Sequence, residues 1–299
     1  MEAAGLSAEP QKRSAGRRLA DLFHGRPRLQ VGTLLAGPIG WLVLGYLGSL
    51  LVLLIAAFWS VDALSGELIK GFTFDNYKEL WDTDVYRSVA FRTIGIASAV
   101  TLTDALLAFP IAFYMAKLAS RRGKGILVVA VLMPLWSFYL VKVYAWQTML
   151  SAHGVINWAL DPIGLNGPGF GATAVWIVES YLWLPYMILP IYAGLERIPN
   201  SLLSASEDLG AKPFETFRRV ILPMAFPAVV AGSIFTFSLT LGDYITPSLV
   251  SPDTQFIGNV VFSSHTNNLP LASAFATVPI VVMVVYLLIA RRLGAFEHL

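Results

Sequence analysis

Six long apolar segments, separated by polar stretches, dominate the hydropathy pattern of this 299-residue chain. Each is 19 to 26 residues long, and a helix needs about 20 apolar residues to cross ~30 Å of hydrocarbon. One such run could be a buried core helix, but no soluble fold has enough core to cover six. The pattern therefore predicts an all-α membrane protein with six transmembrane helices. The predicted spans are Thr33–Phe58, Thr93–Met115, Ile126–Met149, Ala172–Gly194, Met224–Gly242 and Ala272–Ala290.

Charged residues avoid these segments. They make up 13% of the chain, about half of the usual share in a soluble domain, and the net charge is only +2. This composition excludes a disordered chain and a nucleic-acid binder driven by bulk positive charge. The absence of cysteine excludes a disulfide scaffold. Only three charged residues fall inside the predicted spans: Asp104, Lys142 and Glu179.

The basic residues of the loops predict the topology, because loops rich in Lys and Arg stay in the cytoplasm. Sixteen of the 21 basic residues fall in the tail of residues 1–32, the turn at 117–124, the loop at 195–223 and the C-terminal end. The remaining loops carry mainly acids. We therefore expect both termini in the cytoplasm. The predicted organisation is a cytoplasmic tail of residues 1–32 followed by a six-helix membrane domain of residues 33–299.

The cytoplasmic loop of residues 197–223 is longer than a simple turn requires and reads as two short helices. We expect the first to begin at Asn200 or Ser201, which suit a helix cap, and to stop at Gly210. Pro213 suits the first turn of the second helix, which runs toward Pro223. Leu202, Leu203 and Leu209 give the first helix an apolar face. That face either docks on a partner or lies against the protein's own inner surface.

This loop resembles that of ABC-transporter permeases of the binding-protein-dependent import class. Their motif reads Glu-Ala-Ala, three residues, Gly, nine residues, Ile, any residue, Leu-Pro. The chain keeps the spacing, with matches at Ala205, Gly210, Leu222 and Pro223, while Ser204 and Ser206 replace the Glu and the second Ala. The resemblance implies that the loop couples to the ATPase through these residues: Leu202, Leu203, Ser204, Ala205, Ser206, Glu207, Asp208, Leu209, Gly210, Leu222 and Pro223.

Further motifs are similar to those of spermidine/putrescine-type permeases, over roughly residues 34–292. Lys142 stands where that branch has Arg. The motifs are Pro134-Leu-Trp-Ser, Tyr144-Ala-Trp146, Gly154-Val-Ile-Asn157, Leu184-Pro185-Tyr186, Gly242-Asp243-Tyr244 and Gly258-Asn259. The resemblance implies a type I ABC importer permease fold in the bacterial inner membrane and a polyamine substrate. Related permeases for phosphonates, iron chelates or amino acids remain the alternative.

The same resemblance implies the partners: an ABC ATPase dimer, a second similar permease subunit that forms a heterodimer with this one, a solute-binding protein and the lipid bilayer, with no nucleic acid. The chain has no Gly-x4-Gly-Lys-Ser/Thr loop, so we expect ATP and Mg to be used by the partner ATPase and no cofactor to be bound here. Enzyme motifs and metal-ligand clusters are also absent from the sequence. We therefore expect a non-catalytic subunit.

Charged groups within or at the ends of the spans predict the solute path, because a charge buried in lipid costs at least ~2.5–3.5 kcal/mol. Carboxylates facing a cavity would attract a cation, and Trp or Tyr could hold its alkyl-ammonium groups by cation–π contact. Lys142 could instead simply pair with Glu179, and most aromatics could be interfacial belt residues. The candidates are Asp104, Lys142, Glu179, Trp183, Asp243 and Tyr244.

Two other classes of protein compete with this interpretation. An ion-coupled secondary carrier would work without an ATPase, but it leaves the loop between Gly210 and Pro223 unexplained. A membrane-embedded enzyme would need a nucleophile or metal motif, which the sequence lacks.

Overall fold

The computed structural model describes residues 27–62 and 65–292, with side chains from residue 31 onward. Most of the predicted tail, residues 1–32, therefore lies outside the described residues. The chain forms two compact units, residues 1–55 and 56–299. We describe each unit by itself.

The first unit contains one long apolar helix. Helix α2 (Pro27–Trp41) passes through a π-helical segment, η1 (Leu42–Leu47), into α3 (Gly48–Ala56). The apolar part, Val31–Ala56, is long enough to cross a membrane. It matches the first predicted span to within two residues at each end.

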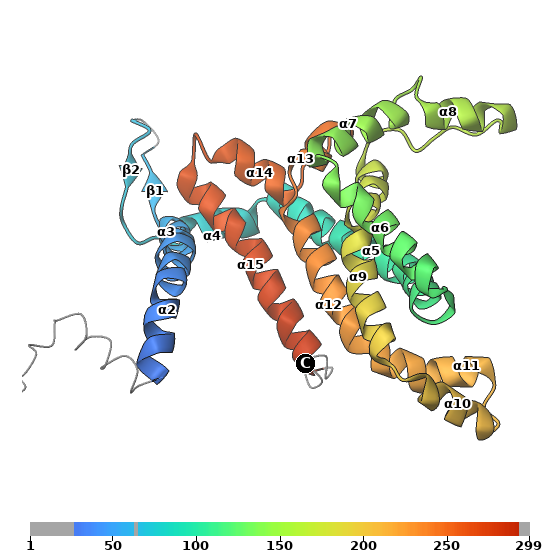
Figure 1. Cartoon of the computed structure of the whole chain (residues 1–299). Coiled ribbons are helices and arrows are strands. Elements are labelled where there is room, and N and C mark those ends of the chain that lie inside the picture. Colours follow the sequence, from blue (N-terminus) through green and yellow to red (C-terminus); the bar gives the residue numbers. More distant parts are fainter. Residues whose placement is uncertain (1–26, 63–64, 293–299) are drawn as a thin grey trace, which may run out of the picture. The chain divides into compact units, whose positions relative to one another are not determined.

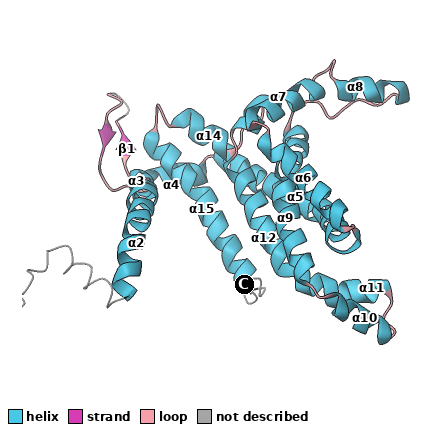
Figure 2. Ribbon diagram, viewed as in Figure 1, coloured by secondary structure: helices cyan, strands magenta, loops and turns pink. Residues whose placement is uncertain are grey.

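The second unit is helical apart from one small hairpin, which Figure 2 shows in magenta. The hairpin strands β1 (Ser60–Val61) and β2 (Leu68–Ile69) pair antiparallel. The helices are α4 (Asp75–Asp82), α5 (Asp84–Phe113) with the π-helical η2 (Tyr114–Leu118), α6 (Arg121–Trp136), α7 (Tyr139–Leu150), α8 (Val155–Leu160) with the 3-10 turn η3 (Asp161–Ile163), α9 (Ala172–Arg197), α10 (Asn200–Asp208), α11 (Pro213–Thr216) with the π-helical η4 (Phe217–Ile221), α12 (Leu222–Gly242), α13 (Ile245–Val250), α14 (Ile257–Ser264) and α15 (Leu269–Arg292).

Among the described residues, five helices are long and apolar enough to cross a membrane, or six if one bent pair is a single span. The exception is the third predicted span, Ile126–Met149. In place of one straight helix, α6 and α7 meet at an angle of 88°. Ser137 and Phe138 between them have extended backbone. Helix α6, at 16 residues, is ~24 Å long and shorter than the ~30 Å hydrocarbon core.

Helix α9 packs against both α5 and α12, and these three helices form the centre of the second unit. Small residues allow the close approach: a Cβ on Gly194 of α9 would lie 2.4 Å from the Cβ of Ala228 of α12. Likewise, a Cβ on Gly232 of α12 would lie 2.7 Å from the sulfur of Met187. Such small-residue contacts are typical of helices packed inside a membrane, where backbones approach closely.

The two ends of the second unit differ in structure. Figure 1 shows α7, α13 and α14 gathered at one end, and α10 with α11 at the opposite end. The same end as α10 holds the turn between α5 and α6, whose lysines contact the α9–α10 junction. The bases of the turn at 117–124 and of the loop at 195–223, which are part of the predicted cytoplasmic side, therefore gather where α10 lies.

Candidate functional site

Helix α10 is a short, exposed helix with a well-formed C-terminal end. Gly210 has a φ of +80°, a left-handed conformation that favours glycine. The N–H of Gly210 donates to the carbonyl of Glu207 (2.8 Å), and that of Ala211 to the carbonyl of Ser206 (3.1 Å). This pair of bonds is a Schellman motif, which satisfies the last carbonyls of a helix. The predicted stop at Gly210 is confirmed.

The N-terminal end of α10 differs from the prediction. Pro199 occupies the capping position and no side chain caps the helix. Asn200 is the first helical residue, and its side-chain oxygen lies 3.4 Å from the ammonium group of Lys117 instead. The prediction that Asn200 or Ser201 caps this helix is therefore wrong, because a contact from a distant element occupies the Asn200 side chain.

The second predicted helix of the loop does not end near Pro223. Helices α11, η4 and α12 run continuously from Pro213 to Gly242, which is 30 residues. Pro213 stands in the first turn, as predicted. Leu222 and Pro223 lie inside this continuous helix, where Pro223 follows the π-helical turns of η4. Any movement of α11 is thus passed directly to the membrane-spanning part of α12.

The three leucines of α10 do not share one face. Leu203 is partly buried against a core cluster that includes Met115, Leu195 and Ile198. Leu209, in contrast, is 89% exposed, and Leu202 is exposed as well. Ser204, Ala205, Glu207 and Asp208 are also exposed, while Ser206 bonds Thr216 of α11 (2.8 Å between the hydroxyl oxygens). One face of α10 is therefore held by its own protein and the other is open.

Asp104 of α5 and Glu179 of α9 are completely buried, at 0% and 1% exposure. Neither oxygen of Asp104 has a hydrogen-bond partner among the described residues, nor does Oε2 of Glu179. The carboxyl groups of Asp104 and Asp243 lie close enough to Glu179 to act on its charge, and the Thr240 hydroxyl also lies near its carboxyl group. The side chains of Ser180 and Trp183, on the same helix as Glu179, also have buried polar atoms without partners. Native proteins rarely leave such groups unpaired.

Asp243, after the end of α12, has the opposite environment. Its Oδ1 accepts hydrogen bonds from the backbone N–H groups of Ile245 (2.9 Å) and Thr246 (3.3 Å). Its Oδ2 accepts one from the Thr246 hydroxyl (2.7 Å) and one from the hydroxyl of Tyr139. Tyr139 comes from α7, so this carboxylate joins α12, α13 and α7.

Two of the candidate aromatics lie in different places. Trp183 is stacked on Tyr139, with ring centroids 5.9 Å apart and an angle of 13° between the planes. Trp183 lies on the same helix as Glu179 and, through Tyr139, adjoins the residues that bind Asp243. Tyr244 is stacked on Phe262 of α14 (4.6 Å, 14°) and lines an apolar pocket of about 460 Å³. The structure brings Trp183, but not the ring of Tyr244, to the acidic residues.

Lys142 bridges the bend in the third span. Its ammonium group donates to the carbonyl of Pro134 (3.1 Å) near the end of α6, and that carbonyl also accepts from the N–H and hydroxyl of Ser137. A cation is favourable at a helix C-terminus, where unpaired carbonyls gather. The alternative that Lys142 pairs with Glu179 is wrong: no ion pair among the described residues includes Lys142.

Sequence reasoning missed three residues that the structure brings to these sites: Tyr139, Thr246 and Lys117. Tyr139 and Thr246 bind Asp243, and Lys117 binds the start of α10. The partners of Tyr139 and Lys117 are 80 or more positions away in the chain. Local spacing holds no signal for such contacts. The Asp243-x-x-Thr246 spacing, typical of a side-chain cap, could have indicated Thr246.

Comparisons with known proteins define the class. Residues 97–296 match the family of the binding-protein-dependent transport system inner membrane component. The chain is 43% identical to the inner membrane ABC transporter permease protein YdcU of Escherichia coli K12, over 94% of this chain and 95% of that protein. It is 30% identical to the spermidine/putrescine transport system permease protein PotB of Salmonella typhimurium LT2, over 85% and 90%.

Solved structures share the fold. One chain of a bacterial alginate ABC transporter, in complex with an alginate-pentasaccharide-bound periplasmic protein, superposes with a TM-score of 0.71 at 16% identity, covering 91% of this chain and 96% of that one. A second structure, of a bacterial ABC transporter involved in the import of the acidic polysaccharide alginate, gives a TM-score of 0.63 at 18% identity, covering 92% of this chain and 99% of that one.

The chain belongs to the family of the binding-protein-dependent transport system inner membrane component. It is the permease subunit of an ABC importer and a multi-pass protein of the inner membrane. The predicted family resemblance is confirmed.

Proposed function

We propose that this permease translocates a polyamine such as spermidine or putrescine, delivered by a solute-binding protein. Asp104 and Glu179 carry the proposal, because two buried carboxyl groups with three unpartnered oxygens between them, at the centre of α5, α9 and α12, fit a cationic solute. Trp183, stacked on Tyr139 close by, offers an aromatic face for an alkyl-ammonium group. The similarity to PotB, named as a spermidine/putrescine permease, supports the same substrate class.

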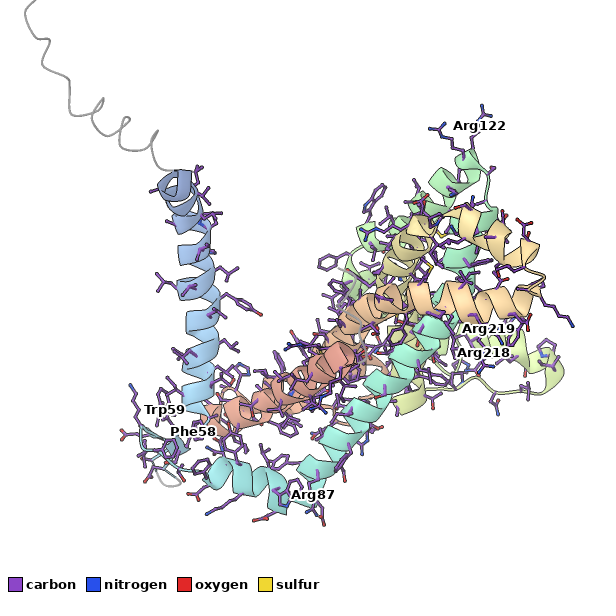
Figure 3. The ribbon with its side chains drawn as sticks, turned by 90° about the horizontal axis from the view of Figure 1, so that it is seen from below. Phe58, Trp59, Arg87, Arg122, Arg218 and Arg219 are labelled. Atoms are coloured by element: carbon purple, nitrogen blue, oxygen red, sulfur yellow. The ribbon has the colours of Figure 1, made fainter. Side chains whose placement is uncertain are left out.

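The end of the second unit that holds α10 faces the cytoplasm in this proposal, together with both termini, and the tail of residues 1–32 precedes the membrane domain. The basic residues of that end support the orientation. Arg218 and Arg219 lie on η4, and Arg122 lies in the first turn of α6 (Figure 3). The opposite end, with α7, α8 and the hairpin, then faces the solute-binding protein.

Helix α10 docks on a partner ATPase in this proposal. Its exposed face, with Leu202 and Leu209, is the part of the loop that its own core does not cover. Its other face is fixed through Leu203 and Ser206, and α11 continues into α12. Closure of an ATPase dimer, which uses ATP and Mg, would therefore move α9 and α12 and open the path alternately to each side. A second, similar permease subunit supplies the other half of the path.

An uptake experiment tests the substrate. The permease is reconstituted in vesicles with its ATPase, its partner permease and its binding protein, and uptake of labelled spermidine is competed with polyamines, amino acids, phosphonates and iron chelates. We expect competition by polyamines alone and no uptake without ATP. Competition by phosphonates or iron chelates would reassign the substrate within the same class. Uptake driven by an ion gradient without the ATPase would overturn the importer mechanism.

Substitutions in α10 test the coupling. Leu209→Asp places a charge on the open face, and Gly210→Pro demands a φ near −65° where the chain has +80°. We expect both variants to lose the solute-dependent stimulation of ATPase activity. Leu209→Met, which keeps the apolar surface, is the matched control and should retain it. Normal stimulation in Leu209→Asp would exclude α10 as the docking element.

A further inference from the structure

Lys117 links two parts of the second unit that the chain itself does not connect. It lies in η2, at the end of the long α5 helix, and is partly buried. Its ammonium group donates to the carbonyl of Ile198 (2.6 Å) and lies 3.4 Å from the side-chain oxygen of Asn200. Ile198 is 3% exposed and forms the junction between α9 and α10.

This junction needs an outside donor. Ile198 has extended backbone (φ −71°, ψ 117°), as expected before a proline, and the N–H of Leu202, four residues on, donates to the carbonyl of Pro199 rather than to that of Ile198. The carbonyl of Ile198 thus lies between the last residue of α9 and the capping residue of α10. A cation at the C-terminal end of α9 also interacts favourably with the helix dipole. Lys117 therefore satisfies a buried carbonyl at the point where the chain turns into α10.

Lys124 supports the arrangement from the next helix. Its ammonium group donates to the carbonyl of Ala116 (2.8 Å), beside Lys117, and lies 3.3 Å from Oε1 of Glu196 near the end of α9. This ion pair is partly exposed, and such pairs contribute little by themselves. Lys124 thus holds the turn that presents Lys117.

The position of Lys117 matters because of how the helices are connected. Helix α10 is joined through the chain to α9 before it and to α11 and α12 after it. Helix α5, which carries the buried Asp104, has no such chain connection; it meets α9 and α10 through apolar packing, in the cluster of Met115, Ile198 and Leu203, and through Lys117. Among the described residues, the hydrogen bonds between the α5–η2 helix and the segment from Ile198 to Asn200 all come from Lys117.

We propose that Lys117 is a positioning residue for energy coupling: by binding the Ile198 carbonyl, it makes α5 move together with α10. This inference rests on the proposed docking of α10 to an ATPase. Without the ammonium group, α10 would still pass movement to α9 and α12, but α5 and Asp104 would follow less closely. Solute transport per ATP would then fall, although ATP would still be hydrolysed.

The first test measures coupling in the reconstituted importer. We expect Lys117→Met to lower the number of solute molecules transported per ATP by roughly tenfold, the order of change that one charge-assisted hydrogen bond exerts on a conformational equilibrium. Complex assembly and basal ATP hydrolysis should stay at wild-type levels. Lys117→Arg, which keeps a charged donor, should restore most of the ratio. Lys117→Gln, which loses charge and reach, should change it in the same direction as Lys117→Met.

Arg122→Met is the matched control, because it removes a basic residue from the same turn. The Arg122 side chain is exposed in the first turn of α6 and points away from the helices (Figure 3). We expect the number of solute molecules transported per ATP in Arg122→Met to equal that of the wild type. An unchanged ratio in Lys117→Met, or an equal loss in Arg122→Met, would overturn the role of Lys117.

The second test needs no ATPase. The chain contains no cysteine, so spin labels can be placed at Leu118→Cys on η2 and Ser204→Cys on α10, both exposed positions. We expect Lys117→Met to broaden the distance distribution between the labels, and Lys117→Arg to keep it narrow. An unchanged distribution contradicts the link itself. If the distribution broadens as expected but Leu209→Asp leaves ATPase stimulation normal, the docking of α10 fails while the link between α5 and α10 stands.

Discussion

Two acidic regions of this permease have opposite environments. Both oxygens of the Asp243 carboxylate are occupied by donors from α13 and from α7. Asp104 and Glu179, deeper in the bundle, have buried oxygens without any partner among the described residues. A carboxylate with all its bonds filled inside its own chain stabilises the fold. A buried carboxyl group without partners is costly, and this cost is acceptable where a ligand completes the site.

The first prediction concerns Asp243, the carboxylate whose hydrogen bonds are all made within the chain. Asp243→Ala removes the acceptor for Tyr139, Thr246 and two backbone N–H groups, so we expect the unfolding free energy to fall by about 2–4 kcal/mol. Denaturant unfolding of the purified permease in micelles measures this. Asp253→Ala removes an exposed acid of a neighbouring loop and should stay within about 0.5 kcal/mol of the wild type. Equal stability of the two variants would contradict a structural role for Asp243.

The second prediction disturbs the packing around Asp243 and leaves its carboxylate in place. A Cβ on Gly258 would lie 2.7 Å from the carbonyl oxygen of Asp243 and 3.0 Å from its carbonyl carbon. We expect Gly258→Ala to push α14 away from this segment and to lower the unfolding free energy by about 1–3 kcal/mol. In Gly242→Ala the new Cβ meets nothing within 4 Å. This control should be as stable as the wild type. A loss of unfolding free energy in Gly242→Ala but not in Gly258→Ala would show that the close packing at Gly258 does not stabilise the segment around Asp243.

The third prediction concerns the unpartnered acids. Both oxygens of Asp104 but only one oxygen of Glu179, Oε2, lack a partner among the described residues, and Gln keeps an acceptor oxygen, so Asp104→Asn and Glu179→Gln should change the unfolding free energy by less than about 1 kcal/mol. Polyamine uptake should fall roughly tenfold, because the cation loses a charged acceptor. Transport assays and unfolding curves on the same preparations measure both effects. Glu79→Gln, which changes an exposed acid, should alter neither.

The outcome of that experiment decides how the two regions compare. Unchanged uptake together with a large loss of stability would move Glu179 into the same structural class as Asp243. Loss of uptake with stability retained would keep the two regions distinct.

Features that depend on contacts between residues close together in the chain could be predicted from the sequence, whereas those that depend on residues far apart in the chain could not. Gly210 ends α10 as predicted, because the left-handed turn and its two bonds are local. Five of the six apolar segments also lie in single long helices, since hydropathy alone decides where a chain can enter lipid. The role of Asp243 depends on Tyr139, which is 104 positions away in the chain. The sequence therefore indicated an acid at the end of the fifth span, close to the predicted solute path, but not the residues that bind its carboxylate.

The third span shows the same limit. Its 24 residues are apolar enough to cross the membrane, and composition therefore predicts one straight helix. The bend after Trp136 arises from contacts that fix α7 elsewhere: Tyr139 binds Asp243, and the side-chain amide of Gln147 donates to the carbonyl of Leu249 (2.8 Å). These contacts to the α13 region favour a turned α7 over a straight continuation of α6.

The last prediction separates the two functions of one aromatic residue that lies between the regions. The Tyr139 hydroxyl donates to Asp243, while its ring stacks on Trp183, which lies on the same helix as Glu179. Tyr139→Phe keeps the ring and removes the hydroxyl, so we expect a loss of only about 0.5–1.5 kcal/mol in unfolding free energy and little change in uptake. Tyr144→Phe, at an exposed tyrosine of the same helix, should be neutral.

A double-mutant cycle makes this prediction specific. If the Tyr139 hydroxyl stabilises the fold through Asp243, its removal should cost less once Asp243→Asn has already weakened the acceptor, giving a coupling energy of at least about 0.5 kcal/mol. Additive effects would contradict the bond between the two residues. A loss of uptake in Tyr139→Phe at full stability would instead mean that the hydroxyl binds the solute. Tyr139 would then belong functionally with Asp104 and Glu179 rather than with Asp243.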